Sequence, residues 1–217
     1  IEFSGSLHTF YNDGEHNYND LNQTAFNVAL NKLYLDLGIR PQNLQLIHLE
    51  WGFNVLPPCQ TNHIIDRLIQ HNSINKTVGI DCKIEGKYIQ FKHSANFLKI
   101  YNKGQHFNLK EPILRIEIKQ TNWSEYRLKG LNTLKDFFNR LIQQWQRVIL
   151  YDINNKKSSK FIHYQTTTYW DELRKTKSNK SFKYHFDKLK RLNQKIGFNN
   201  QNKITKLLIK KGNKLQL

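Results

Sequence analysis

Two short segments of the chain combine residue types that could break a phosphodiester bond. Each alternates polar and apolar residues, so each is predicted to be a strand whose polar side chains share one face. These polar residues are Lys99, Tyr101 and Lys103 in the first segment, and Arg115, Glu117 and Lys119 in the second. The flanking lysines would favour the phenolate of Tyr101 and bind a phosphate that the phenolate attacks. The alternative interpretation is a packed sheet tyrosine, which is the commoner use of this residue.

A histidine and a carboxylate stand two residues apart in another predicted strand. His48 and Glu50 would share one face, which is a workable half of a divalent metal site. Glu117 would add a further ligand if its strand is a neighbour. We therefore expect Mg²⁺ or Mn²⁺, which would polarise a phosphate while Tyr101 attacks. The competing interpretation is that His48 and Glu50 simply face solvent.

The cations of the two strands are the predicted DNA-binding residues of this site: Lys99, Arg115 and Lys119. Arg115 and Lys119 could bind phosphate or pair with Glu117, and both uses remain open. None of the common nucleotide or metal signatures is present, such as a Walker loop, a glycine-rich dinucleotide turn or a C-x-x-C pair.

The charge of the chain points to a polyanionic partner. It has 34 lysines and arginines against 17 aspartates and glutamates, a formal net charge of +17. Such an excess costs self-repulsion, and nucleic acid is the commonest partner that offsets it. A generally basic proteome in an AT-rich host is the alternative explanation.

No segment suggests a membrane or an exported protein. No apolar run is long enough to span a bilayer, and the first residues lack the features of a signal peptide. Cys59 and Cys82 are interpreted as reduced, structural thiols, so we expect a cytoplasmic location in a bacterial host cell. Because the chain begins with Ile1 and contains no methionine, we expect it to be a piece whose N-terminus is missing.

The rest of the sequence predicts the elements that position these residues. Helices are predicted over 19–37, 61–71 and 133–151, a strand or turn over 4–11, a strand over 44–55, and a hairpin over 78–91 that turns at 85–86. This order predicts an α+β fold, in which a mainly antiparallel sheet carries helices on one face and leaves the other free for a ligand.

Two domains are expected along the chain. Residues 1–155 would form the catalytic domain, and 156–217 a basic helical DNA-binding extension. Shorter helices are predicted in the extension over 167–175, 182–195 and 203–210. Its lysines and arginines would bind DNA through the phosphates.

Five short motifs follow one another in a recognisable order. They are Ser-Gly-Ser-Leu at 4–7, Leu-Glu-Trp-Gly-Phe-Asn-Val at 49–55, Lys-Ile-Tyr-Asn-Lys-Gly at 99–104, Leu-Arg-Ile-Glu-Ile-Lys at 114–119 and Lys-Gly-Leu-Asn-Thr-Leu at 129–134. In this order the chain resembles phage and plasmid replication proteins of the gene II/gene X type, the rolling-circle initiators of filamentous phages. The resemblance covers about residues 4–140, in short motifs rather than continuous similarity.

The resemblance implies a role for each matching residue. Tyr101 matches the nucleophile of that family and Lys103 the lysine two residues after it, while Glu50 and Glu117 match its acidic residues. The chain departs from the family in lacking the part that usually precedes Ser4. A His-hydrophobic-His metal pair, typical of many other rolling-circle nickases, is also absent, and the segment 48–50 stands as a candidate variant of it.

The expected function is therefore that of a rolling-circle replication initiator. Such an endonuclease nicks one strand of a DNA origin and forms a covalent 5′-phosphotyrosine linkage. Its expected partners are the origin duplex and single strand, with a host helicase and polymerase, while the sequence does not set the oligomeric state. A non-catalytic DNA- or single-strand-binding replication protein is the leading alternative, and an RNA-binding protein using the open sheet face is the third.

Overall fold

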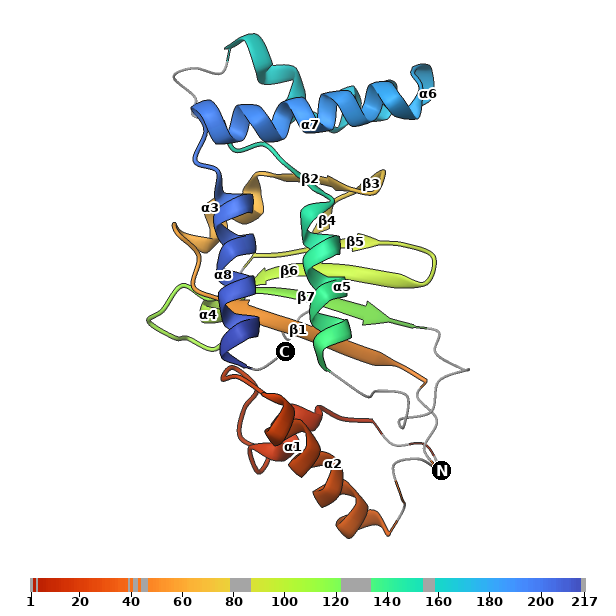
Figure 1. Ribbon diagram of the computed structural model, residues 1–217, viewed down its shortest axis with the longest axis vertical. Coiled ribbons are helices and arrows are strands. Elements are labelled where there is room, and N and C mark those ends of the chain that lie inside the picture. The colour runs from red at the N-terminus through yellow and green to blue at the C-terminus, as the bar shows by residue number, and fades with distance from the viewer. Residues whose placement is uncertain are drawn as a thin grey trace.

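A five-stranded antiparallel sheet forms the centre of the protein (Figure 1). The computed structural model describes residues 2, 4–38, 40, 43, 47–78, 87–121, 134–153 and 159–215. In spatial order the strands are β1 (Leu49–Val55), β7 (Leu114–Gln120), β6 (Asn96–Asn102), β5 (Tyr88–Lys92) and β4 (Thr77–Val78). All four neighbouring pairs are antiparallel, which confirms the predicted α+β class.

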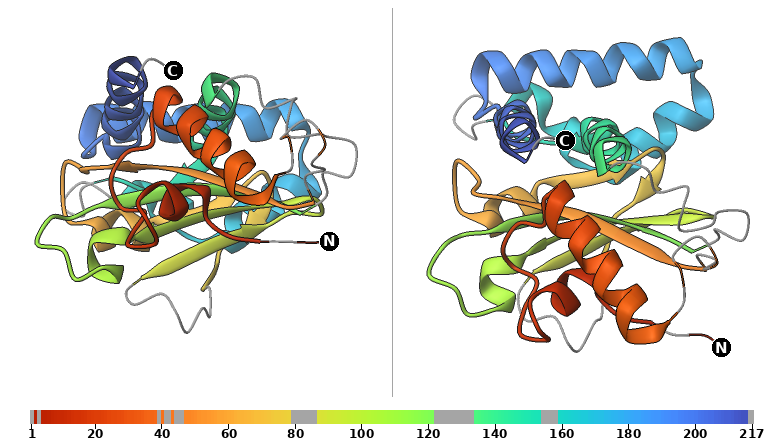
Figure 2. Two further views of the ribbon diagram at one scale, coloured as in Figure 1. Left: turned by 90° about the horizontal axis from the view of Figure 1, so that it is seen from below. Right: turned by 60° about the horizontal axis from the view of Figure 1, so that its bottom comes forward.

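Helices cover one face of this sheet. α5 (Leu134–Gln146) and α8 (Asn200–Lys214) lie on the same side of it and contact each other (Figure 2). α3 (Thr61–Asp66) contributes to the same core. Alternation along the strands turns apolar residues such as Ile100 and Ile116 toward these helices, and both are fully buried. The main hydrophobic core therefore lies on this face, and the polar residues of the same strands lie on the other.

The N-terminal helices lie at one end of the sheet. α1 (Leu7–Tyr11) and α2 (Gln23–Leu37) contact each other, and Phe26 of α2 packs in the main core. The side chain of Asn22 caps α2, since its oxygen accepts a hydrogen bond from a backbone N–H of the first turn. A further short helix, α4 (Lys103–His106), follows β6 directly.

A second sheet separates the main core from a smaller one. Its three strands, in order, are β3 (Ile74–Asn75), β2 (Leu68–His71) and β8 (Val148–Leu150). Leu68 belongs to the main core and Ile69 to the smaller one, as expected for successive residues of a strand. Its strands β2 and β8 are therefore buried on both faces.

The smaller core joins the C-terminal helices to the second sheet. It contains Trp170 and Leu189, and is formed by η4 (Ser159–Gln165), α6 (Thr167–Thr176) and α7 (Asn179–Ile196). The helices predicted over the C-terminal region are thus present.

The last helix does not belong to this smaller core. Ile204 and Leu208 of α8 are fully buried in the main core. The expected division at residue 155 therefore does not coincide with the boundary between the two cores, because residues 156–217 contribute to both.

Three predicted elements differ in the structure. The predicted strand or turn over 4–11 contains the helix α1, and the helices predicted over 61–71 and 133–151 end at Asp66 and Gln146 and give way to β2 and β8. In the last two cases the apolar residues of the strand, Leu68 and Ile69 in β2 and the whole of β8, continue the apolar pattern of the preceding helix, and periodicity alone does not separate the two elements. The hairpin turn at 85–86, Thr133 and the boundary at 155 lie outside the described residues.

The described residues also bear on the predictions about membrane spans and cysteines. In the parts of the chain that the structure describes, no helix has both the length and the apolar character needed to cross a membrane. Cys59 is a free thiol, and Cys82 falls outside these parts.

Candidate active site

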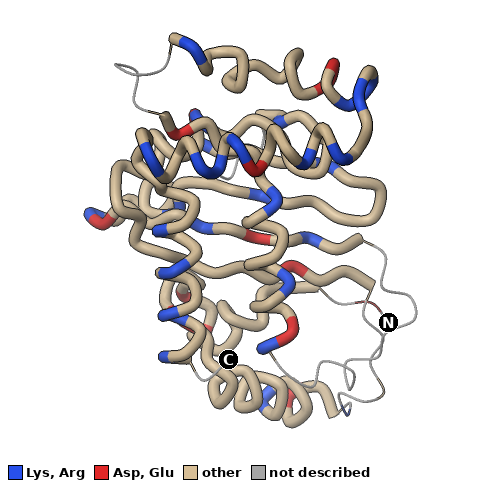
Figure 3. Tube along the Cα trace, turned by 45° about the horizontal axis from the view of Figure 1, so that its top comes forward, with Lys and Arg blue, Asp and Glu red and all other residues tan. Residues whose placement is uncertain are grey.

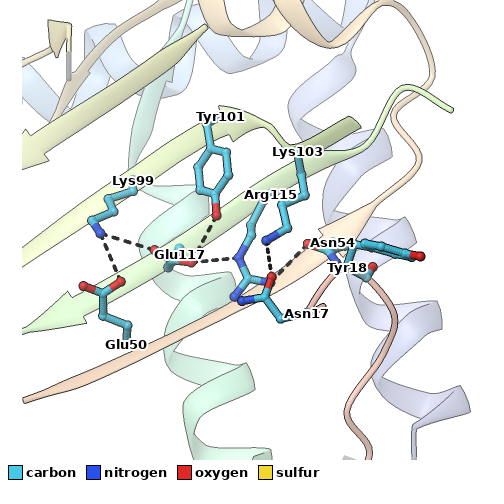
Figure 4. Close-up of polar contacts among 9 residues, drawn as sticks. All are labelled: Asn17, Tyr18, Glu50, Asn54, Lys99, Tyr101, Lys103, Arg115 and Glu117. Atoms are coloured by element: carbon cyan, nitrogen blue, oxygen red, sulfur yellow. Dashed lines mark hydrogen bonds and ion pairs between the residues drawn. The ribbon is translucent and has the colours of Figure 1, made fainter. Parts of the chain in front are cut away.

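The polar face of the central sheet gathers nearly all the residues that the sequence singled out (Figure 4). The contributing side chains are Glu50 and Asn54 from β1, Arg115, Glu117 and Lys119 from β7, and Lys99 and Tyr101 from β6. The strand register explains the grouping: Glu117 stands opposite Lys99 on one side and Gly52 on the other. Side chains opposite each other in an antiparallel pair lie close enough to interact.

Lys99 connects the two carboxylates of this face. Its ammonium nitrogen lies 3.0 Å from Glu50 Oε2 and 3.4 Å from Glu117 Oε1. Lys119 contacts the other oxygen of Glu50 at 3.0 Å. The structure thus contains one position where a single positive charge is shared by two carboxylates from different strands.

Glu117 is held ionised by its neighbours. Burial raises its pKa, but the charges of Arg115 and Lys99 outweigh burial and bring the pKa to about 2. The Nε of Arg115 donates a hydrogen bond of 2.7 Å to Glu117 Oε2. A second nitrogen of Arg115 donates to Asn54 Oδ1 at 3.2 Å. Arg115 is therefore paired with Glu117, one of the two uses that the sequence left open.

Tyr101 lies beside this ion pair. Its hydroxyl donates a hydrogen bond of 3.4 Å to Glu117 Oε2, and the residue is only 5% exposed. Burial raises the pKa of the phenol well above its usual value, and the negative charge of Glu117 adds to the effect. The resting phenol is therefore protonated, and it needs additional positive charge before it can act as a nucleophile.

Lys103 lies near Tyr101 but not on the strand face that the sequence predicted. The strand β6 ends at Asn102, whose side-chain oxygen accepts from Gln105 N and starts α4. Lys103 is the first residue of that helix and is 2% exposed. The following Gly104 is tightly enclosed, because a β-carbon there would overlap the Glu111 carbonyl oxygen.

The surroundings of Lys103 change its titration. Its ammonium donates a hydrogen bond of 2.7 Å to Asn17 Oδ1 and lies 4.5 Å from the Phe107 ring centre. Burial and the charge of Arg115 lower its pKa to about 7. A sizeable fraction of Lys103 is therefore neutral near pH 7, and its nitrogen lies 5.9 Å from the centre of the Tyr101 ring.

The loop between α1 and α2 supplies site residues that the sequence did not indicate. Asn17 contacts Lys103, and the Tyr18 carbonyl accepts a hydrogen bond of 2.9 Å from Asn54 Nδ2. His8 lies close enough to be affected by the charges of this site, because burial and then Arg115 and Lys103 lower its pKa. This loop covers one end of the polar face. The face is therefore less open than the sequence predicted, because we expected it to be entirely free for a ligand.

His48, the third predicted metal ligand, has no described contact with the other two. It is exposed and precedes β1, and no hydrogen bond joins it to Glu50 or Glu117 among the contacts that the structure describes. Within the same residues, no group of three or more histidines, cysteines, aspartates or glutamates is placed to hold a metal ion. Of the predicted ligands, Glu50 and Glu117 are the two that the structure brings together, through their shared contact with Lys99.

Comparison with protein-family models, with curated proteins and with solved structures gives no match. The geometry of the polar face is therefore the basis for assigning a function to the protein.

Proposed function

We propose that the protein nicks one strand of DNA as a rolling-circle initiator, with Tyr101 as the nucleophile. One observation carries the proposal: a tyrosine, two carboxylates that share a cation, and a surplus of basic side chains gather on one sheet face. The hydroxyl of Tyr101 would attack a backbone phosphorus, forming an O–P bond as the bond to the 3′ oxygen breaks. The products would be a 5′-phosphotyrosine and a free 3′-hydroxyl.

The charge of the face supports binding of a phosphodiester. It contains two carboxylates against the basic side chains of Lys99, Arg115 and Lys119, and Lys103 of α4 lies beside it. Even with Lys103 partly neutral, positive charge exceeds negative charge, and a backbone phosphate would be attracted to it.

The two carboxylates fit a divalent cation. Mg²⁺ and Mn²⁺ commonly use one or two protein carboxylates, with water and substrate phosphate as the remaining ligands. Glu50 and Glu117 already converge on the ammonium of Lys99, so these two carboxylates are the residues that would hold a divalent cation. When bound, such a cation supplies the positive charge that polarises the phosphate.

Lys103 and Glu117 are the candidate groups for handling the phenolic proton. Glu117 accepts the hydrogen bond from Tyr101, and Lys103 with a pKa of about 7 can accept a proton near neutral pH. Lys103 would then protonate the departing 3′ oxygen, so the proton lost by Tyr101 ends on the 3′-hydroxyl. Glu117 Oε2 lies 3.4 Å from the phenol oxygen, and the nitrogen of Lys103 lies 5.9 Å from the centre of the Tyr101 ring.

Covalent adduct formation tests the proposal directly. Labelled supercoiled and single-stranded DNA would be incubated with the protein and Mg²⁺ or Mn²⁺ and resolved on a denaturing gel. A labelled adduct is expected for the wild type and for Tyr88→Phe, a matched control whose ring contacts that of Tyr101. No adduct is expected for Tyr101→Phe. An adduct that survives this substitution would move the nucleophile elsewhere.

A second candidate function is DNA binding without cleavage. The burial of Tyr101 and its raised pKa favour this alternative, because both withhold the phenol from reaction. The two functions differ in the same assay: tight binding without any adduct, on either form of DNA and with either metal, would favour the binding protein.

A further inference from the structure

Five side chains at the far end of the molecule form a second candidate binding surface. We call it the aromatic–basic surface, and it consists of His163 in η4, Tyr169 in α6, and Tyr184, His185 and Lys188 in α7. These helices lie beyond the second sheet, at the end opposite α1 and α2 (Figure 1). None of the five residues takes part in the site around Tyr101.

Ring contacts make these side chains one cluster. The His163 ring centre lies 4.7 Å from that of Tyr169, and Tyr169 lies 5.8 Å from His185. His185 in turn lies 5.3 Å from Tyr184, and the Lys188 ammonium is 6.0 Å from the Tyr184 ring centre. The charge of Lys188 also acts on both histidines, adding to burial in lowering their pKa values.

One side of the cluster is held by contacts with the smaller core, and the other side is exposed to solvent. The hydroxyls of Tyr164 and Tyr169 lie 2.9 Å and 2.8 Å from His185 Nδ1, and Tyr164 is fully buried in the smaller core. In contrast, Tyr184 is 55% exposed, and His163 is exposed as well. α7 already packs against the smaller core through its apolar residues. The exposed ring of Tyr184 is therefore not needed for packing.

The charge around these rings is strongly positive. From 159 to 196 the chain has ten lysines and arginines against three aspartates and glutamates. Six of these ten lie along α7, which contains a single acidic residue, Asp187 (Figure 3). Within the described part of the chain, no ion pair joins a lysine or arginine of α7 to a carboxylate. Their charge is therefore available to an anionic partner.

We propose that the aromatic–basic surface binds single-stranded DNA, with bases stacked on Tyr184 and His163 and phosphates held by Lys188 and the neighbouring lysines. Exposed rings interleaved with unpaired cations match a single strand, whose bases are accessible, better than a duplex, whose bases are already stacked. The proposal extends the proposed nicking function, because cleavage followed by strand displacement releases a single strand. The surface would hold that strand away from the polar face that contains Tyr101.

Binding of a labelled oligo(dT) of about 12 nucleotides tests this surface, measured by fluorescence anisotropy. The full chain is used with Tyr101→Phe present throughout, so that no cleavage can occur. Tyr184→Leu, which keeps an apolar side chain but loses the aromatic face, is expected to weaken oligo(dT) binding at least about fivefold. Tyr184→Phe keeps the ring and is expected to bind like its parent. A blunt duplex of the same length should bind both variants equally.

Other outcomes would overturn the proposal. Unchanged oligo(dT) binding by Tyr184→Leu would exclude stacking at this residue, and equal weakening by Leu and Phe would indicate a hydroxyl contact instead. An equal loss of duplex binding would show a general effect of charge or folding. Tighter binding of oligo(rU) than of oligo(dT) would assign the surface to RNA. Because cleavage is not measured, failure of the nicking proposal would leave this result unaffected.

Discussion

At the scale of single residues, Lys103 titrates far from the pH at which an exposed lysine does. Its folded pKa of about 7 lies below the ordinary value of 10.5. Between these two pH values the unfolded chain holds a proton that the folded chain lacks, so stability rises with pH in this window and is flat below it. Burial of this lysine therefore costs most stability at neutral and acidic pH.

This difference predicts a pH-dependent effect of Lys103→Met. The variant lacks the titrating group, so its gain in unfolding free energy over the wild type should be largest below about pH 7 and shrink toward pH 10. Urea denaturation at several pH values within this range measures the difference. Parallel curves for the two proteins would show that the pKa of Lys103 is not depressed in the fold.

Glu117 is the residue on whose charge the polar face depends. Glu117→Gln would leave the buried cations Arg115 and Lys99 facing a neutral amide, so we expect a loss of about 3 kcal/mol in unfolding free energy. Glu50→Gln is the matched control, because Glu50 is 38% exposed and its loss should cost about 1 kcal/mol or less. Chemical denaturation near neutral pH compares them. Equal losses would contradict the central role of Glu117.

The low pKa of Glu117 also fixes the sign of its pH dependence. Because the folded pKa of about 2 lies below the ordinary 4.5, its contribution is fully present above the ordinary value and is lost as pH falls toward 2. The stability difference between the wild type and Glu117→Gln should therefore narrow in acid.

At the scale of elements, the close pairing of β1 and β7 depends on Gly52. A β-carbon there would lie 2.7 Å from the Ile116 carbonyl oxygen and 2.9 Å from Glu117 Cβ. The backbone must shift to accept it, so we expect Gly52→Ala to lower the unfolding free energy by about 1–3 kcal/mol. Gly5→Ala, with nothing within 4 Å, is the control. Unchanged melting of Gly52→Ala would contradict this packing.

The strands of this sheet show which positions of the site residues could be predicted from the sequence. Alternation was enough to predict that Lys99 and Tyr101 share a face, and that Glu117 lies between two cations on the next strand, because side-chain direction in a strand is a local property. The prediction that Lys103 lies on the same strand face was wrong. The strand ends at Asn102, which caps α4, so Lys103 is already helical. The contact of Asn17 with Lys103 joins positions 86 residues apart, and no local pattern encodes such a contact.

At the scale of the whole molecule, the positive charges on the two sides of the second sheet differ in whether they are paired with carboxylates. On the polar face the positive charges of Lys99, Arg115 and Lys119 are paired with carboxylates. On α7 they have no such partners among the described residues. The net charge of +17 is therefore unevenly available to a polyanion, and the C-terminal helices should dominate long-range attraction.

The salt dependence of DNA binding tests this uneven distribution. An unpaired lysine near a phosphate releases a counterion on binding, so Lys183→Gln on α7 should reduce the slope of log K against log salt by about 0.7–1. Lys32→Gln should leave the slope nearly unchanged, because Lys32 is already paired with Asp13 at 2.7 Å. Anisotropy titrations across a range of salt concentrations give both slopes. Equal slopes for the two variants would mean that DNA does not approach α7, and that its basic residues only maintain the net charge.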